Sequence, residues 1–416
     1  MPATRSTDKS LWGHASTPVF YHPVQHADHQ FISIQKIPVF VAQSGRVPNS
    51  AFAPFTDDDF AIAHDPGFVQ GVFSMRLSNG FGTRDESVNN ALRYSSASLW
   101  AATDHVLGPE GSGPRRIACS ATQGFHHSGY DFAGGYCTFN GLVIAARKAM
   151  RQYPDIGRVL IIDGDGHYGN GTDDIIRRGN LTTIINITRP DIGPDGDGGP
   201  HSSFTATDWL EWTADLITTH RPGLILFQSG GDAWSSDPYG AGYLSREALH
   251  FRDAGVFTAA VTAGIPLVWN LAGGYADPMQ RTIDIHLETL RTSDRILGGE
   301  TLVTPRPALG SGEAVCVRML QSRKGEDLLR TLTAEAADKD GWQILEGADE
   351  YVGDGLDHIA YWLRNEFARL VGGRLGASAP QMALVNLRKV ARHVLRIDSG
   401  PVPQPDLTGL SVPVAR

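Results

Sequence analysis

The chain has 416 residues, of which 41% are hydrophobic and 19% charged, and its formal net charge is -9. This is enough apolar material for one large domain plus a smaller one, or for two domains. The acidic balance, without any Lys- or Arg-rich run, argues against nucleic acid as a partner. Three widely spaced cysteines, Cys119, Cys137 and Cys316, exclude a disulfide framework and fit a reducing cytoplasm.

The sequence also lacks features that would direct it to a membrane. No apolar run reaches the about 18 residues that a membrane-spanning helix needs, and residues 1–14 carry no apolar signal-peptide core. Arginine far outnumbers lysine, which is typical of a GC-rich, bacterial genome. We therefore expect a cytoplasmic protein that does not contact a membrane and that could form a homo-oligomer.

The middle of the chain alternates between strand and helix patterns. Residues 1–60 show weak periodicity, with a first strand predicted near 37–42, and residues 61–108 are mainly helical. Further on, strands are predicted at 117–120, 158–164, 181–188, 224–227 and 266–271, and helices at 140–151, 172–178, 206–219, 244–254 and 279–296. This order favours an α/β fold, with a mostly parallel central sheet between two helix layers. Ligands of such sheets bind at the carboxyl ends of the strands.

The composition changes after about residue 300. Residues 301–311 are rich in Pro and Gly, helices are predicted at 357–371 and 381–395, and residues 400–416 form a docked or disordered tail. We therefore divide the chain into a main domain, residues 1–300, and a C-terminal extension, residues 301–416. The sequence does not indicate a role for this extension.

The most informative segment follows the predicted strand 158–164 and reads Asp163-Gly164-Asp165-Gly166-His167. Residues two apart on an extended backbone face the same way, so Asp165 and His167 can converge just past the strand. A carboxylate beside an imidazole is half of an oxygen/nitrogen metal site of the kind that Zn²⁺ accepts.

Two further strands also end in residues that could carry chemistry. His126 and His127 follow the strand 117–120 and could form a general acid/base pair. Alternatively, one of them caps the loop and the other is solvated. Asp232 follows the strand 224–227 and could be a third metal ligand or the N-cap of the next segment.

A tyrosine follows the last strand of the set. Two glycines after the strand 266–271 let the backbone bend, so the hydroxyl of Tyr275 could donate to an oxyanion. The alternative is a turn followed by a core tyrosine. Cys137 is better explained as a small buried hydrophobic residue than as a nucleophile.

Together these segments resemble the zinc-dependent histone deacetylase family, which has an arginase-like fold and includes acetylpolyamine-deacetylating and bacterial amidohydrolases. The resemblance covers residues 124 to about 297 and extends back to Phe81. It rests on Gly124-Phe125-His126-His127, Gly134-Gly135-Tyr136-Cys137, Asp163 to Gly171, Gly230-Gly231-Asp232, Asp237-Pro238 and Gly273-Gly274-Tyr275. It implies an arginase/deacetylase-like three-layer αβα fold, and that residues 1–300 form a deacetylase-like catalytic domain.

The resemblance also implies a metal centre and an acid/base pair. One zinc ion per chain would be held by Asp165, His167 and Asp232. His126 would be oriented by Asp163. His127 would be oriented by Asn170. Some relatives have an aspartate at this position, whereas this chain has an asparagine, as does the class II branch of the family.

Further implied roles concern the substrate and a second ion. Tyr275 would be the oxyanion donor, and Gly135 with Tyr136 would wall the tunnel for an acyl-lysine side chain. A structural potassium ion would lie near the backbone of residues 163–167, with ligands around Asn186 and Ile187. Residues 190–194 replace the family's Pro-Gly-Phe-Phe-Pro stretch, so the opposite tunnel wall is expected to lack its aromatic residue.

The implied reaction is hydrolysis of an N-acyl amine by metal-activated water, with His127 moving the proton. The substrate could be an acyl-lysine, an acetylpolyamine or another small acylated metabolite. Two other functions remain alternatives. One is an arginase-type ureohydrolase, which needs a second metal ion, and the other is a catalytically silent homologue that binds acyl-lysine.

Overall fold

The computed structural model describes residues 16–27, 31–109, 116–188, 204–239 and 242–303. They belong to the first of the two units into which the chain divides, residues 1–305 and 306–416. The helices predicted at 357–371 and 381–395, most of the linker at 301–311 and the tail at 400–416 lie outside the described residues, as does Cys316. The division near residue 300 and the role of the extension stay predictions.

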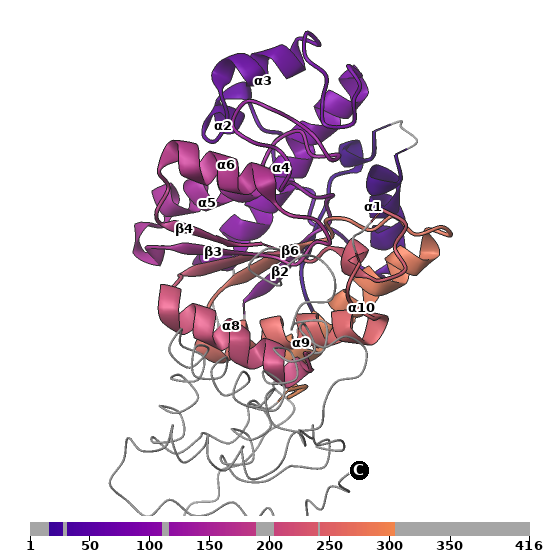
Figure 1. Cartoon of the computed structure of the whole chain (residues 1–416), viewed down its shortest axis with the longest axis vertical. Coiled ribbons are helices and arrows are strands. Elements are labelled where there is room, and N and C mark those ends of the chain that lie inside the picture. The colour runs from indigo at the N-terminus through magenta and orange to yellow at the C-terminus, as the bar shows by residue number, and fades with distance from the viewer. Residues whose placement is uncertain (1–15, 28–30, 110–115, 189–203, 240–241, 304–416) are drawn as a thin grey trace, which may run out of the picture. The chain divides into compact units, whose positions relative to one another are not determined.

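A parallel β-sheet forms the centre of the described region (Figure 1). Within the described residues it has six strands in the order β1-β2-β6-β5-β3-β4, and all neighbouring strands pair in parallel. The strands are β1 (Val19–Phe20), β2 (Ile117–Ser120), β3 (Val159–Asp163), β4 (Ile184–Ile187), β5 (Leu224–Gln228) and β6 (Leu267–Asn270). The strands predicted from residue 117 onward are confirmed, with ends shifted by at most three residues.

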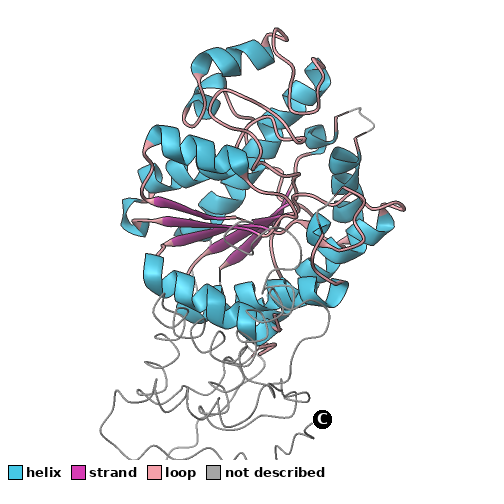
Figure 2. Cartoon of the chain, viewed as in Figure 1, coloured by secondary structure: helices cyan, strands magenta, loops and turns pink. Residues whose placement is uncertain are grey.

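Helices cover both faces of the sheet, so the three-layer αβα prediction is confirmed (Figure 2). Helices α4 and α5 pack on one face, and α1, α8, α9 and α10 contribute to the core on the other. The helices are α1 (Ile32–Gln43), α2 (Asp57–Ala61), α3 (Pro66–Phe73), α4 (Glu86–Leu107), α5 (Gly141–Gln152), α6 (Asn170–Gly179), α8 (Ala206–His220), α9 (Arg246–Ala263) and α10 (Gln280–Leu297). Short 3₁₀ turns lie at Pro23–His26, Pro154–Ile156 and Gly231–Ala233.

Successive side chains of a strand point to opposite faces of the sheet, so each strand contributes to the hydrophobic core on both faces. In β3, Val159 and Ile161 pack with α4 and α5, whereas Leu160 and Ile162 pack with the helices on the other face. All four side chains are buried, because a strand covered by helices on both faces has no solvent-facing side. Full burial of such a side chain contributes about 1.5–3 kcal/mol, so the sheet is a stable base for the loops at its carboxyl edge.

The predicted strand at 37–42 is wrong, because these residues belong to the helix α1. The side chains of Ile34, Ile37, Phe40 and Val41 are buried at helical spacing. Packing of this stripe in the core with α10 outweighs the usual cost of Pro38 inside a helix. The first strand is instead the short β1.

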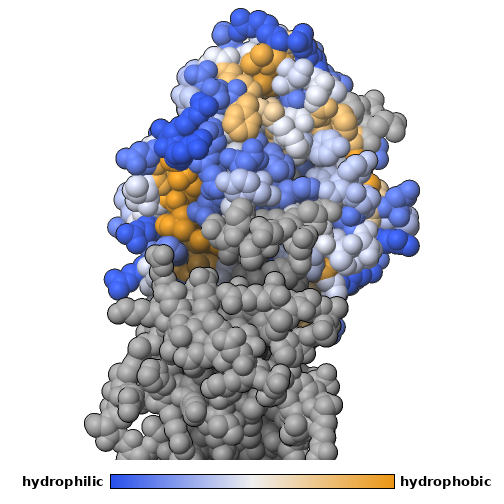
Figure 3. Space-filling model, in the orientation of Figure 1, coloured by the Kyte–Doolittle hydropathy of each residue, from blue (hydrophilic) through white to orange (hydrophobic). Residues whose placement is uncertain are grey.

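The exposed surface is mixed in character. On the face that Figure 3 displays, hydrophilic residues are interspersed with smaller hydrophobic areas. No helix among the described residues is long and apolar enough to span a membrane.

Candidate metal centre and active site

The candidate site lies where the connections of the sheet diverge. Strand β3 leads into α6, which packs beside α5, whereas the neighbouring β5 leads toward α9 in the opposite layer. Divergent connections between adjacent parallel strands open a crevice at their carboxyl ends. The loops after β2, β3, β5 and β6 all leave this edge, and they carry the tandem histidines, Asp165 with His167, Asp232 and Tyr275.

The structure brings Asp165, His167 and Asp232 together, with one ligand atom of each within 4.8 Å of the others. The Nδ1 atom of His167 is 3.3 Å from Oδ1 of Asp165 and 3.0 Å from Oδ2 of Asp232. Nε2 of His167 lies 2.6 Å from the carbonyl oxygen of Tyr239. That bond requires a proton on Nε2. Hydrogen bonds to Asp165 and Asp232 raise the pKa of His167 to about 11, so without a cation Nδ1 also carries a proton and donates to these carboxylates. A metal ion would take the place of that proton.

This donor set fits a divalent metal ion. Asp165 and Asp232 are buried side by side, and burial together with the charge of Asp165 raises the pKa of Asp232 to about 6. A cation between two such carboxylates removes their mutual repulsion. Two carboxylate oxygens and one imidazole nitrogen form a three-residue donor set that leaves room for water, as catalytic metal sites do.

Backbone amides from neighbouring loops hold the two carboxylates in place. The amide of Gly273 donates to Oδ2 of Asp165 over 2.9 Å, and the amide of Gly166 donates to Oδ1 of Asp232 over 3.0 Å. A Cβ atom on Gly273 would lie 2.2 Å from Oδ2 of Asp232, so this approach requires glycine. Asp232 does not cap a helix, because α9 is capped by Ser245.

The tandem histidines have unequal partners. His126 is buried, and its Nδ1 is 2.7 Å from Oδ2 of Asp163. His127 is half-buried, and its Nδ1 is 2.7 Å from Oδ1 of the exposed Asn170. The two predicted pairings are therefore present as hydrogen bonds.

Because of these different surroundings, the two imidazoles differ in pKa. Burial alone would lower the pKa of His126, but the charges of Asp163 and Asp165 outweigh it and raise this pKa to about 9. Burial lowers the pKa of His127, and the charge of His126 lowers it further. His126 is thus the cationic ring and His127 the neutral one near pH 7.

Tyr275 is half-buried beside this group. Its amide donates to Oδ2 of the buried Asp237 over 2.6 Å, which fixes the start of the side chain. Burial and the charges of Asp232 and Asp165 raise the pKa of the phenol well above its ordinary value. The hydroxyl stays protonated and forms no hydrogen bond within the described part of the chain, so it is able to donate to a substrate.

Gly135 lies against His127, and Tyr136 lies beside Tyr275. Gly135 has a positive φ of 52°, and a Cβ there would lie 2.3 Å from Cδ2 of His127. Tyr136 also has a positive φ, 61°, which is uncommon for a residue with a side chain and typical of functional sites. Its ring is 5.7 Å from the ring of Tyr275.

Two further aromatic side chains lie near Tyr136. The sequence did not indicate this grouping. The rings of Phe31 and Phe81 lie 6.1 and 5.9 Å from the ring of Tyr136. We call Phe31, Phe81 and Tyr136 the aromatic wall. Phe31 precedes α1 and Phe81 lies in the loop before α4, so only the fold brings them here.

A buried arginine was also missed. The Nη1 atom of Arg252 donates to the carbonyl oxygens of Gly164 and Gly230 over 2.8 and 3.0 Å. These glycines belong to the loops that carry Asp165 and Asp232. Asp253 and Ser229 accept the remaining hydrogen bonds of the guanidinium group. Arg252 on α9 therefore links the two loops that carry Asp165 and Asp232 through hydrogen bonds to their backbone.

A buried lysine from α1 reaches the loop of Tyr275. The Nζ atom of Lys36 donates to the carbonyl oxygens of Ala272 and Gly274 over 2.5 and 3.4 Å. It lies 5.6 Å from the ring centre of Tyr275. Burial lowers the pKa of Lys36 to about 8 despite the nearby carboxylates. In the sequence, the only indication of this role was that Lys36 is a single charged residue within an apolar segment.

The remaining predictions have different outcomes. Cys137 is buried and its thiol pKa is raised by burial, as expected for a small hydrophobic residue. Oδ1 of Asn186 is buried without a partner among the described residues, but the potassium ion with Asn186 and Ile187 stays a prediction. Residues 190–194 lie outside the described residues.

The chain is similar to known proteins over part of its length. A family model described as the histone deacetylase domain matches residues 33–201. Histone deacetylase 2 of Arabidopsis thaliana is 29% identical over 180 residues, which cover 40% of this chain and 46% of that protein. Acetylpolyamine amidohydrolase 1 of Pseudomonas aeruginosa is 28% identical over 206 residues, which cover 44% of this chain and 57% of that protein.

A solved structure extends the likeness to the fold. The crystal structure of the HDA15 HD domain superposes with a TM-score of 0.52 and 17% identity, over 70% of this chain and 90% of that one. The matched family model includes the loops after β2 and β3, with the tandem histidines, Asp165 and His167. The family model, these relatives and the solved structure together support a protein of the histone deacetylase family with the arginase/deacetylase fold.

Proposed function

We propose that this protein is a zinc-dependent deacetylase that hydrolyses the amide of an N-acylated amine. The observation that carries this proposal is the position of the neutral imidazole. The ring of His127 is 4.1 Å from the ring of the cationic His126 and 5.8 Å from the ring of His167. A candidate base thus borders the trio of Asp165, His167 and Asp232, with Tyr275 also nearby.

The trio would hold the metal ion and the histidines would move the protons. When bound, zinc supplies a Lewis acid for the acyl oxygen and lowers the pKa of water to about 7. Asn170 accepts from Nδ1–H of His127, so Nε2 keeps the lone pair that takes the proton from water. The same Nε2 later protonates the amine nitrogen as the C–N bond breaks.

Two other residues would stabilise the charge that develops during hydrolysis. The phenol of Tyr275 donates a hydrogen bond to the oxygen of the tetrahedral intermediate, because its raised pKa keeps it protonated. His126, between Asp163 and Asp165, contributes positive charge beside the base. Neither group needs to change its protonation state in the reaction.

The substrate class follows from the aromatic wall and the relatives. An acyl-lysine side chain and an acetylpolyamine both present an amide on an aliphatic chain, which can pack on Tyr136 and Phe81. The likeness to histone deacetylase 2 supports acyl-lysine, and the likeness to acetylpolyamine amidohydrolase 1 supports a small acylated amine.

The decisive experiment is a hydrolysis panel with the full-length chain. Acetyl-lysine peptides, acetylpolyamines and lysine peptides with longer acyl groups are compared with and without a chelator. We expect amide hydrolysis that the chelator abolishes and added Zn²⁺ restores. Hydrolysis that persists in the chelator would contradict the metal premise. Metal-loaded protein that binds acyl-lysine peptides but hydrolyses nothing would instead support a silent binding protein.

A further inference from the structure

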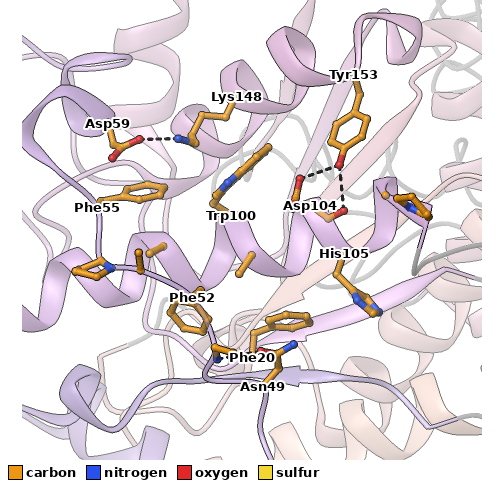
Figure 4. Close-up of a pocket in the computed structure, with 17 residues that line it drawn as sticks. Phe20, Asn49, Phe52, Phe55, Asp59, Trp100, Asp104, His105, Lys148 and Tyr153 are labelled. Atoms are coloured by element: carbon orange, nitrogen blue, oxygen red, sulfur yellow. Dashed lines mark hydrogen bonds and ion pairs between the residues drawn. The ribbon is translucent and has the colours of Figure 1, made fainter.

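A separate pocket of about 680 Å³ lies among the loop 49–55, the second half of α4 and the end of α5 (Figure 4). None of its lining residues belongs to the candidate active site. Its volume falls within the range of about 300–1,000 Å³ that is usual for small-molecule sites. The nature of its walls indicates which ligands it can accept.

Aromatic side chains line the pocket, and polar pairs lie on either side of Trp100. Phe52, Phe55 and Trp100 are among the lining residues. In Figure 4 the pair of Asp59 with Lys148 lies on one side of Trp100, and the pair of Asp104 with Tyr153 lies on the other. The pocket therefore combines aromatic faces with carboxylates.

One end of the pocket already holds an ammonium group, that of Lys148. Its Nζ atom is 5.0 Å from the ring centre of Phe55 and 5.3 Å from that of Trp100, within the range of cation–π attraction. The same atom is 2.6 Å from Oδ1 of Asp59. An ammonium group is thus stabilised here by two aromatic faces and one carboxylate.

The other end has a carboxylate without a cation. Oδ1 of Asp104 accepts from the hydroxyl of Tyr153 over 2.8 Å and from the side-chain amide of Gln152 over 2.6 Å. Both donors are neutral, and Asp104 has no ion-pair partner within the described ranges. Asp59 and Lys148 compensate each other, so the charge of Asp104 is the one left unmatched in the pocket.

We propose that this pocket binds a small organic ammonium compound with a flat apolar body. The ammonium group pairs with Asp104, and the apolar body lies against Phe52 and Trp100. At this end the ammonium group of the ligand would contact a carboxylate and an aromatic ring, as the ammonium group of Lys148 does at the other end. This site is independent of the proposed hydrolysis, because it shares no residue with the active site.

Three probes with one ring system test the proposal by calorimetry on the full-length chain. Tryptamine carries an ammonium group, tryptophol is its neutral alcohol, and indole-3-propionate is an anion. We expect tryptamine to bind at least about tenfold more tightly than the other two, as one added charge pair with aromatic contact allows. Binding should persist in Asp165→Asn protein, because the active site is not involved.

Variants separate the charge from the aromatic contribution. Asp104→Asn should remove the preference for tryptamine, whereas Asp58→Asn, at an exposed residue of α2, should leave it unchanged. Phe52→Ala, in a loop, should weaken all three probes alike and does not disturb a core strand. Equal binding of the three probes, tighter binding of the anion, no binding, or an unchanged preference in Asp104→Asn would each overturn the proposal.

Discussion

The polar centre and the aromatic wall of the candidate site are built in different ways. The carboxylates and imidazoles of the centre lie in loops that leave central strands directly, and amides and Arg252 hold these loops. The wall is made from the residue before α1, the loop before α4 and a residue of positive φ after β2. We infer that the sheet determines the reaction, whereas the more distant segments determine which substrate is accepted.

The largest effect is expected from Asp165→Asn, which tests the centre. The amide keeps the shape of the side chain but removes a charged ligand, so metal content and amide hydrolysis should both be lost. The loss of metal affinity should exceed the about 10–100-fold cost of an outer partner. Metal analysis and turnover measure it.

Stability distinguishes this effect from misfolding. Without metal, Asp165 repels Asp232, but despite burial the charges of His126 and His167 and hydrogen bonds hold the pKa of the Asp165 carboxyl well below its usual value. The metal-free variant should therefore melt somewhat lower than the metal-free parent protein but still unfold cooperatively. Asp215→Asn, at an exposed position of α8, is the matched control and should retain metal and activity. A fully active, metal-loaded Asp165→Asn protein would remove Asp165 from the site.

The same contrast explains what the sequence could predict. Asp163, Asp165 and His167 directly follow the apolar run of β3, so their position at the sheet edge follows from strand periodicity. Neighbouring loops with Asp232 and Tyr275 could be placed by the same rule. The alternation of strands and helices was likewise sufficient for the three layers.

The residues that sequence reasoning missed depend on contacts between remote segments. Lys36 and Arg252 act through backbone carbonyls, and a carbonyl leaves no mark in the sequence. Phe31 and Phe81 resemble any other core residue until the fold brings them to Tyr136. The misassigned strand at 37–42 has the same origin, because packing on α10 determined the state of a segment that contains Pro38.

The next largest effect is expected from Tyr275→Phe, at the border of the centre and the wall. Loss of the hydroxyl should lower kcat by about 10²–10³-fold, because one oxyanion donor is removed. Metal content and KM should change little, since the ring remains. Tyr136→Phe, the same change within the wall, should have a far smaller effect on kcat. Equal effects of the two substitutions would contradict the division between reaction and substrate.

A smaller effect is expected from Arg252→Lys, which tests how the centre is held. Lysine keeps the positive charge, but its single ammonium nitrogen cannot contact Gly164 and Gly230 while also reaching Asp253 and Ser229, as the guanidinium group does. Metal affinity should fall by about tenfold, the lower end of the range for outer partners. Arg291→Lys, at an exposed residue of α10, is the control. Unchanged metal affinity in the variant would show that the two loops hold their positions without Arg252.

The smallest change in rate is expected from Asn170→Asp, which alters only the partner of the proposed base. Burial and the charge of His126 now lower the pKa of His127. A carboxylate at the place of the Asn170 oxygen, which is 2.7 Å from Nδ1, would favour the protonated ring and so raise this pKa. His127 acts as a base in its neutral form, so the acid limb of kcat/KM should move upward by about one pH unit.

The shift should shrink in high salt, because Asn170 is exposed and its replacement would be screened. The other charged or titratable groups that face His127 are His126, His167 and Asp165, and none of them is changed. Asn170→Ser, which is neutral, should leave the limb in place or move it downward. An acid limb that does not move in Asn170→Asp would mean that another group takes the proton from water.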